Sequence, residues 1–287
     1  MLSGSILFMG GSRRLRRSAV TCCVAALFTL SFALEAGVQA QPRRVGGPAA
    51  PLPPVHPSAR RSFTGILMWH DVVPRDKLVW FDTTTAELKA EFESIRKRGL
   101  TPITLEALAD HLEKGTPVPP GAVVLTFDDN NLGLYRHLYP LARQYRWSVA
   151  LFVHTDYVGV RTGKDHCTWD QLREMEKSGF VRVYPHTASH PPDLRKVSAK
   201  KLKVELEKPL QLIRKELGEH RPFFAYSEGH YNERVARAVL AAGYRLAITE
   251  DHGPAERSSN LMMVNRYSMH GRAKQAIAEV AAAKARR

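Results

Sequence analysis

Acidic and histidine side chains gather at three places in the chain, each directly after a run of apolar residues. The three groups are Asp128 with Asp129 after residues 122–127, His186 with His190 after residues 180–184, and His70 with Asp71 after residues 65–69. Adjacent buried carboxylates raise each other's pKa, and a metal ion removes that difficulty by neutralising one of them. Histidines four residues apart lie on the same side of a helical turn, so we expect both imidazoles to reach one ion. One carboxylate, two histidines and an open coordination position predict a hydrolytic metal site.

The remaining side chains of these groups fit the base and the acid of a hydrolysis. The second aspartate can accept a proton from water, and a further histidine can donate one to the leaving group. Taken singly, each group has a simpler structural explanation, because an aspartate pair often caps a helix and spaced histidines are common on surfaces. Their joint occurrence at three predicted strand ends favours the functional interpretation.

Short apolar runs alternate with amphipathic segments from residue 63 onward. We expect strands at 65–69, 122–127, 148–153, 180–184, 223–226, 245–248 and 264–268. We expect helices at 85–98, 105–112, 132–145, 168–179, 198–217 and 232–242, with Pro209 kinking or splitting the fifth. This alternation predicts an α/β fold of one domain, built on a parallel sheet or barrel whose functional residues follow the carboxyl ends of the strands.

Several of these motifs resemble, in order and spacing, those of the polysaccharide deacetylase family. They are VLTFDD at 124–129, HTASH at 186–190, and FFAY at 223–226 followed by Gly229 and Tyr231-Asn232. The resemblance covers residues 63–270. It implies a distorted (β/α) barrel of about seven strands that removes acetyl groups from glycans with one divalent metal ion (Zn, or Ni, Co or Fe).

The segment ILMWHDV at 66–72 resembles the branch of that family that de-N-acetylates poly-β-1,6-N-acetylglucosamine, an exported biofilm polymer. The resemblance implies a role for each of six residues: Asp128 as general base, Asp129, His186 and His190 as metal ligands, His70 as the acid that protonates the amine, and Arg266 as the group that orients the base or the acetyl group. We also expect Glu228, Tyr226 and Trp69 to contact the substrate.

The sequence departs from the family pattern at three places. Asn130 stands where the family has glycine, and asparagine tolerates a left-handed backbone better than most residues. Ser227-Glu228 replaces a Pro-Tyr pair whose tyrosine lends its backbone N–H to the oxyanion, and Pro185 replaces a small residue. Because the base and all three ligands are present, we expect an active enzyme. A peptidoglycan- or chitin-type deacetylase and a catalytically silent glycan-binding homologue remain open alternatives.

The N-terminal segment has the pattern of a secretory signal. Four arginines between residues 13 and 17 precede an uncharged run at 18–34, and Val38-Gln39-Ala40 offers small residues for cleavage. Twin-arginine export and an uncleaved N-terminal anchor remain alternatives. We therefore expect a signal peptide at 1–40, a linker at 41–61, the deacetylase domain at 62–270 and a basic helix or tail at 271–287. The expected location is secreted, periplasmic or cell-envelope, without stable membrane insertion after cleavage.

Composition narrows the classes of partner. With 44% hydrophobic and 24% charged residues the 287-residue chain is typical of a globular protein, and three cysteines exclude a disulfide scaffold. The net charge of +14 suits nucleic acid, membrane surfaces or acidic polymers. Nucleic acid is disfavoured as a partner, because the chain is predicted to be exported and has no aromatic residues interleaved among its basic residues. We expect an N-acetylated polysaccharide as partner and leave the oligomeric state open.

Overall fold

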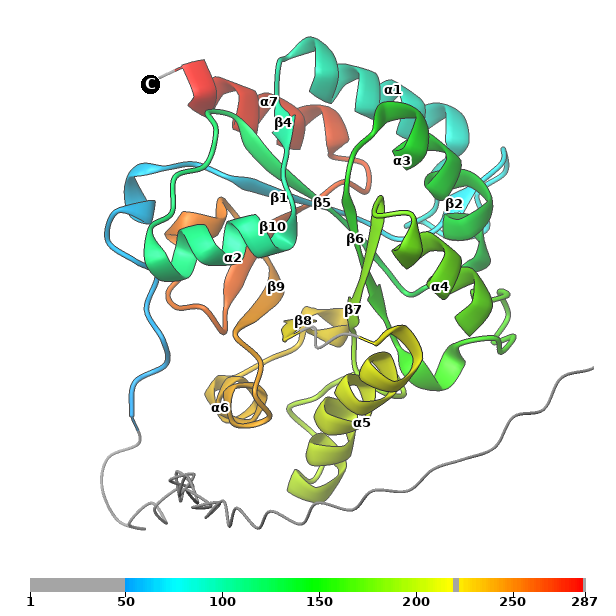
Figure 1. Ribbon diagram of the computed structural model, residues 1–287, viewed down its shortest axis with the longest axis vertical. Helices are drawn as coiled ribbons and strands as arrows, with labels where there is room; N and C mark the ends of the chain where they lie inside the picture. Colours follow the sequence, from blue (N-terminus) through cyan, green and yellow to red (C-terminus); the bar gives the residue numbers. More distant parts are fainter. Residues whose placement is uncertain (1–49, 219–221, 286–287) are drawn as a thin grey trace, which may run out of the picture. The chain divides into compact units, whose positions relative to one another are not determined.

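The computed structural model describes residues 50–218 and 222–285, which form a nearly closed α/β barrel of parallel strands (Figure 1). Predictions for residues 1–49 lie outside the described residues. The strands follow the order β7–β6–β5–β1–β10–β9–β8, and the short β4 pairs with β5. Their bounds are β1 Gly65–Trp69, β4 Thr101–Pro102, β5 Ala122–Asp128, β6 Val149–Val153, β7 Val181–Pro185, β8 Phe223–Ala225, β9 Leu246–His252 and β10 Val264–Ser268. A separate small pair consists of β2 Val72–Val73 and β3 Thr83–Thr84.

Helices return the chain between successive parallel strands. They are α1 Thr85–Lys97, α2 Leu105–Lys114, α3 Tyr139–Tyr145, α4 Trp169–Lys177, α5 Ala199–Leu217, α6 Glu233–Ala241 and α7 Ala273–Ala285. Shorter turns are η1 Ala59–Arg61, the π-helical η2 Leu134–Leu138, η3 Thr155–Tyr157, η4 Ser227–Gly229 and η5 Ala255–Arg257. Polar side chains start five of the helices by accepting a backbone N–H three residues on: Thr84, Thr104, Thr168, Ser198 and Asn232.

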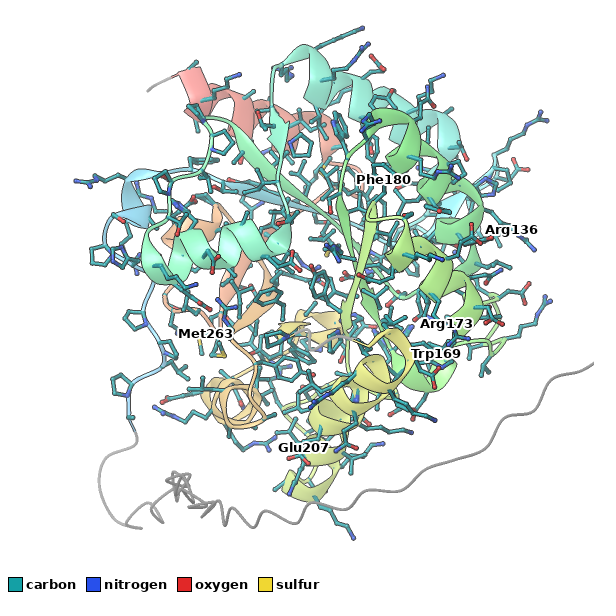
Figure 2. All side chains as sticks on the ribbon, in the orientation of Figure 1. Arg136, Trp169, Arg173, Phe180, Glu207 and Met263 are labelled. Carbon is teal, nitrogen blue, oxygen red and sulfur yellow. The ribbon has the colours of Figure 1, made fainter. Side chains whose placement is uncertain are left out.

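Continuous apolar runs form the central strands because both faces of each strand are covered. β1, β5 and β6 are buried along their whole length. Successive side chains divide between two apolar clusters, Ile66 and Val124 in one, Leu67 and Leu125 in the other. Figure 2 shows side chains filling the interior of the ring of strands, while the exposed Arg136 projects from the outer surface.

The observed elements confirm the predicted fold class, with one correction inside α5. Pro209 was expected to kink or split this helix; the split is wrong, because α5 runs from Ala199 to Leu217 with Pro209 inside it. Leu206, Pro209 and Ile213 are all buried. Packing of this face on the barrel therefore outweighs the hydrogen bond that proline cannot make.

The ends of the domain also differ from the expectation. A linker was predicted over 41–61, but in its described part Val55 and Ala59 are buried in the core and the backbone N–H of His56 donates to the Leu112 carbonyl at 2.7 Å. Beyond residue 270, α7 buries Ala276, Ile277 and other apolar residues against the barrel. The folded unit thus spans more chain than residues 62–270. None of the helices in the described part of the chain is long and apolar enough to cross a membrane.

Candidate metal centre and active site

The turn after β5 places two neighbouring carboxylates in different surroundings. Asp128 ends the strand, whereas Asp129 and Asn130 have left-handed φ angles of 76° and 39°. The backbone carbonyl of Asp129 accepts a hydrogen bond from Nε2 of the buried His154 at 3.1 Å. A left-handed backbone is costly for residues other than glycine, so a fixed hydrogen bond at this point helps to hold the turn.

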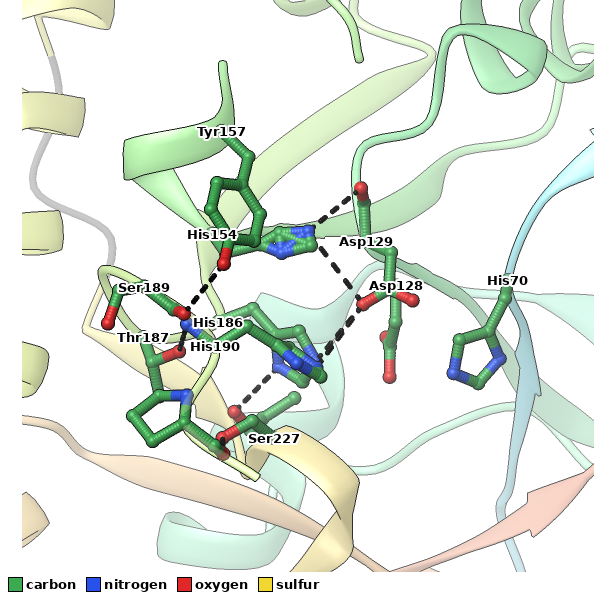
Figure 3. A network of polar contacts seen from close by, with 12 residues as sticks. His70, Asp128, Asp129, His154, Tyr157, His186, Thr187, Ser189, His190 and Ser227 are labelled. Carbon is green, nitrogen blue, oxygen red and sulfur yellow. Dashed lines mark hydrogen bonds and ion pairs between the residues drawn. The ribbon is translucent and has the colours of Figure 1, made fainter. Parts of the chain in front are cut away.

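Asp129, His186 and His190 come together as the sequence predicts. Oδ1 of Asp129 lies 3.7 Å from Nε2 of His186 and 3.6 Å from Nε2 of His190 (Figure 3). Nδ1–H of His186 donates to the Ala225 carbonyl at 2.8 Å, so its Nε2 carries the lone pair that faces Asp129. This bond also links the ends of β7 and β8, the two strands that end the ladder around the barrel.

The chemistry of this cluster fits a divalent cation. Oδ1 of Asp129 is buried and has no hydrogen-bond partner among the described residues. Burial raises the pKa of Asp129 to about 8, and the charges of Asp128 and Glu228 add to the effect. The three ligand atoms lie within 4.8 Å of one another. A carboxylate oxygen and two imidazole nitrogens suit zinc and related divalent ions, and a cation here offsets the burial of the carboxylate.

The two histidines meet through a loop, which corrects the helical turn expected from their spacing. Thr187 and His190 have φ angles of 71° and 49°, and residues 186–190 lie outside every helix of the described chain. Glu205 of α5 fixes this loop. Its buried carboxylate accepts the backbone N–H groups of Ala188 and Ser189 at 2.9 and 2.8 Å.

The departure at Ser227-Glu228 has a structural counterpart. The buried Ser227 hydroxyl donates to the Pro191 carbonyl at 3.1 Å, beside the ligand His190. His230 donates from Nδ1 to the next carbonyl, that of Pro192, at 2.9 Å. Glu228 between them has a left-handed φ of 52° and an exposed side chain near Asp129 and His190. The serine therefore connects the loop after β8 to the loop that carries His190, the second predicted histidine ligand.

Asp128 forms a buried ion pair with Arg266 of β10. Nη2 of Arg266 lies 2.7 Å from Oδ2 of Asp128 and 3.6 Å from Oε1 of Glu250. Burial by itself opposes ionisation of Asp128, but the charges of Arg266, His186 and His70 outweigh it and lower its pKa to about 2. Asp128 is thus held as a carboxylate beside the predicted ligands, which is the state that a general base requires.

His70 lies on the far side of Asp128 from the metal ligands (Figure 3). Its Nδ1 is 2.7 Å from Nε2 of His270, a residue that sequence reasoning left without a role. The Phe81 ring packs on His70 with centroids 5.2 Å apart. Burial lowers the pKa of His70 to about 3, although the Asp128 charge opposes this shift.

The side chains of Trp69 and Tyr226, which were expected to contact the substrate, are buried away from it. Trp69 is fully buried, stacks on Phe127 with centroids 5.1 Å apart and donates from Nε1 to Glu91. Tyr226 is also fully buried, and its hydroxyl donates to the Met262 carbonyl at 2.8 Å. Trp69 is the last residue of β1 and Tyr226 directly follows β8, and both rings pack in the apolar core.

Trp80 is the exposed tryptophan near the site, with 78% of its surface accessible. It precedes Phe81, which packs on His70, and follows the exposed Leu78 and Val79. The loop 78–81 contributes lining residues to two cavities. One of 440 Å³ is lined by Val79, Phe81 and the ligands Asp129 and His190, and the other, of 610 Å³, by Trp80 and His270.

Sequence reasoning found six residues of this cluster and missed three. His154, Glu205 and His270 support the others, but each is a single polar residue without a nearby motif. The contact between His270 and His70 exists because β1 and β10 are adjacent strands. The sequence could have revealed it only through a prediction of which strands are neighbours.

Comparisons with known proteins agree with the fold and the motifs. The model of the family described as polysaccharide deacetylase matches residues 115–247. YxkH of Bacillus subtilis (strain 168) is 23% identical over 201 residues, which cover 70% of this chain and 69% of YxkH. A poly-β-1,6-N-acetyl-D-glucosamine N-deacetylase of Escherichia coli (strain K12) is 26% identical over 136 residues, covering 42% of this chain and 20% of that protein. The chain thus matches about a fifth of the length of the E. coli relative.

Among solved structures, IcaB from Ammonifex degensii has the same fold. The TM-score is 0.67 at 22% identity, over 77% of this chain and 97% of that one. The family model and the fold together confirm the resemblance inferred from the motifs. Residues 115–247 thus carry a polysaccharide deacetylase domain, and the protein is a hydrolase that acts on amide bonds.

Proposed function

We propose that the protein removes acetyl groups from the acetamides of an N-acetylglucosamine polymer in the cell envelope or outside the cell. The observation that carries the proposal is the buried cluster of Asp129, His186 and His190 beside the Asp128–Arg266 ion pair. The E. coli relative, whose name gives poly-β-1,6-N-acetyl-D-glucosamine as its substrate, supports this polymer as the first to test. The signal pattern at residues 1–40 supports export.

Asp129, His186 and His190 would hold one divalent cation, zinc or one of nickel, cobalt and iron. When bound, such a cation polarises a carbonyl and makes a water molecule acidic. Asp128 accepts the proton of the attacking water as a bond forms between the water oxygen and the acetamide carbon. Arg266 keeps Asp128 ionised and fixes its orientation. His70 donates a proton to the sugar nitrogen as the carbon–nitrogen bond breaks, and acetate and a free amine leave.

The side chains around the centre fit a sugar chain. The exposed Trp80 offers an aromatic face at the 610 Å³ cavity, and its neighbour Phe81 lines the 440 Å³ cavity. Its loop is anchored, because Asp82 accepts the N–H groups of Leu78 and Val79 at 2.8 and 3.1 Å, and Lys164 binds both Asp71 and Asp82. The Glu228 backbone N–H serves as donor to the oxygen on which negative charge develops, and its carboxylate contacts the sugar.

A substrate panel tests this proposal. Acetate release is measured with acetylated oligomers of poly-β-1,6-N-acetylglucosamine, with chito-oligosaccharides and with peptidoglycan. We expect the fastest release from the β-1,6-linked oligomers. Faster release from one of the other two polymers would assign the protein to the peptidoglycan- or chitin-type deacetylases instead.

A catalytically silent glycan-binding protein is the second candidate, because Glu228 places a carboxylate near the cluster, where its charge opposes the negative charge that develops on the acetamide oxygen. Binding of the oligomers without acetate release by the metal-loaded protein would support it. In that case Glu228→Tyr, which restores the aromatic residue typical of the family, separates a loss caused by Glu228 from one caused by the remaining site.

A further inference from the structure

His70 and His270 stand side by side because of the register between two strands. Leu67 of β1 pairs with Tyr267 of β10, and Met68 pairs with Ser268. Continued by two residues, the same register brings position 70 opposite position 270. The Met269 N–H donates to the Met68 carbonyl at 3.0 Å, so the strands still run together at this point.

The two imidazoles form a direct nitrogen–nitrogen hydrogen bond. Nδ1 of His70 lies 2.7 Å from Nε2 of His270, with ring centroids 4.8 Å apart. Nδ1 of His270 is buried and has no hydrogen-bond partner among the described residues. His70 is therefore the hydrogen-bond partner that satisfies the half-buried ring of His270.

Aromatic side chains hold both rings in place. Phe81 packs on His70 at 5.2 Å, and Trp80 meets His270 edge-on at 5.5 Å with an interplanar angle of 81°. Both aromatics belong to the loop that Asp82 and Lys164 anchor. The loop thus fixes the relative position of the two imidazoles.

Charges around the pair favour one shared proton over two. Asp128 attracts a proton to either ring, whereas Arg266 repels it from both. His186 also faces His70, and Lys77 and Asp82 face His270, while Glu91 of α1 lines the cavity beside it. Burial lowers the pKa of both rings. When one ring binds a proton, the other stays neutral and can accept a hydrogen bond from it.

We propose that His270 is a positioning residue for the deacetylation: it accepts a hydrogen bond from Nδ1–H of His70, aims Nε2 of His70 at the leaving amine, and shares the positive charge of the acid form. This inference rests on the proposed function. In the step itself the Nε2–H bond of His70 breaks, its proton goes to the amine nitrogen that keeps the electron pair of the broken carbon–nitrogen bond, and the imidazole pair becomes neutral. Solvent then returns one proton to the pair.

His270→Phe and His270→Gln test the proposal in the metal-loaded protein. Phenylalanine keeps the ring against Trp80 but accepts no hydrogen bond, whereas the glutamine amide oxygen can take the place of Nε2. In His270→Phe we expect kcat to fall about 10-fold or more with little change in KM, and the alkaline limb of the pH profile to move to lower pH, because the acid form of His70 loses its stabilising acceptor. His270→Gln should recover much of kcat.

A spectroscopic measurement keeps the inference separate from the activity. In protein with 15N-labelled histidine, we expect a hydrogen-bonded ring N–H signal that disappears in both His70→Gln and His270→Phe. His56→Gln, beside the C-terminal end of α2, serves as the matched control and should keep both the signal and the rate. Thermal unfolding of each variant identifies one that fails to fold.

The outcomes distinguish the two claims. If the wild-type protein binds metal but releases no acetate, the proposed function fails, and the ring signal still tests the imidazole pair. If acetate is released and His270→Phe keeps both the wild-type kcat and the wild-type alkaline limb, the positioning role of His270 is overturned. A ring signal that survives in His270→Phe would overturn the hydrogen bond itself.

Discussion

At the scale of single residues, two adjacent aspartates lie in different surroundings because the backbone turns between them, which suits the different tasks proposed for them. The left-handed φ of Asp129 turns its carboxylate toward His186 and His190, while Asp128 remains beside Arg266. Without a cation, burial raises the pKa of Asp129 to about 8, and Arg266 helps to lower that of Asp128 to about 2. The ionised Asp128 suits a base, and the cost of burying the Asp129 carboxylate suits a group that a cation neutralises.

Isosteric amides should separate these tasks. Asp129→Asn removes the negative charge that faces the cation, so we expect metal affinity to fall about 10- to 100-fold or more, measured by calorimetric titration with zinc. Asp128→Asn should keep metal affinity within a few-fold and lose at least about 100-fold in kcat, because the base is gone. The assignment of base and ligand is wrong if the two variants exchange these effects.

The ion pair of Asp128 with Arg266 should set the acidic side of the pH profile. Asp128 acts as a carboxylate, so activity is present above its pKa and lost as the pH falls through it. Arg266→Met removes a charge that lowers this pKa, and burial then raises it, so the acidic limb of kcat/KM should move to higher pH. Arg266→Lys keeps the charge and should move the limb less. An unmoved limb in a folded Arg266→Met variant, with metal saturating, would show that Asp128 is not the titrating base.

At the scale of elements, the loops after the strands are tied by buried polar groups. Glu205 of α5 accepts two N–H groups of the ligand loop and pairs with Lys201 at 2.6 Å. Ser227 connects the same loop to the end of β8. These bonds hold residues 187 and 190 in left-handed conformations that the backbone alone disfavours.

Glu205→Ala should therefore loosen the metal centre from a distance. The buried N–H of Ala188 loses its acceptor, at a cost of about 1–3 kcal/mol, and the half-buried N–H of Ser189 adds to it, so we expect a lower melting temperature. Zinc affinity should fall roughly 10-fold, because His190 is less well placed. Lys203→Ala removes an exposed cation of the same helix that pairs with Glu207, and it is the control, with near wild-type affinity. Equal affinities in all three proteins would mean that the loop is fixed without Glu205.

The anchored loop 78–81 leads to a second prediction at this scale. Trp80→Ala removes the exposed aromatic face, so KM for long oligomers should rise roughly 10-fold, equivalent to ~1.4 kcal/mol. The lost contact with His270 should lower kcat less than His270→Phe does, because the hydrogen bond between the two imidazoles remains. Trp80→Phe should retain much of the affinity. Val204→Ala, an exposed apolar residue on α5, is the surface control. An unchanged KM for every oligomer length would remove Trp80 from the substrate site.

The hydrophobic period predicted the elements well, since every predicted strand is present and the helix expected at 168–179 begins at a capping box of Thr168 and Gln171. It could not predict contacts between elements. The 186–190 spacing suggested a helical turn, but flanking Pro185 and Pro191 and the Glu205 carboxylate favour a loop. The sequence also could not predict which tryptophan is exposed, because tertiary packing buries Trp69 and leaves Trp80 at the surface.

At the scale of the whole molecule, the net charge of +14 lies largely outside the site. Residues 1–40 hold four arginines and one glutamate, and Lys and Arg are frequent on α5. Several of the α5 cations are paired, such as Lys201 with Glu205 and Lys208 with Asp156. The positive charge therefore fits attraction of the protein to an anionic cell envelope, and not a role in the hydrolysis itself.

Salt should separate these two roles. Surface attraction is screened within about 10 Å at 0.1 M salt, so retention of the protein on an anionic polymer matrix should fall steeply with added salt. Turnover of a short neutral oligosaccharide should stay flat, because the buried ion pair and ligands are screened much less. Turnover that falls in parallel with retention would place the surface charge in the reaction.

The most direct test of the central claim is acetate release by the purified protein before chelation, after complete removal of bound metal, and after one equivalent of zinc is restored. Acetylated β-1,6-linked N-acetylglucosamine oligomers are the substrate, and Asp129→Asn is assayed in parallel. We predict that release stops on removal, returns with zinc, and does not return in Asp129→Asn. Release that continues unchanged without metal would contradict a deacetylase centred on Asp129, His186 and His190.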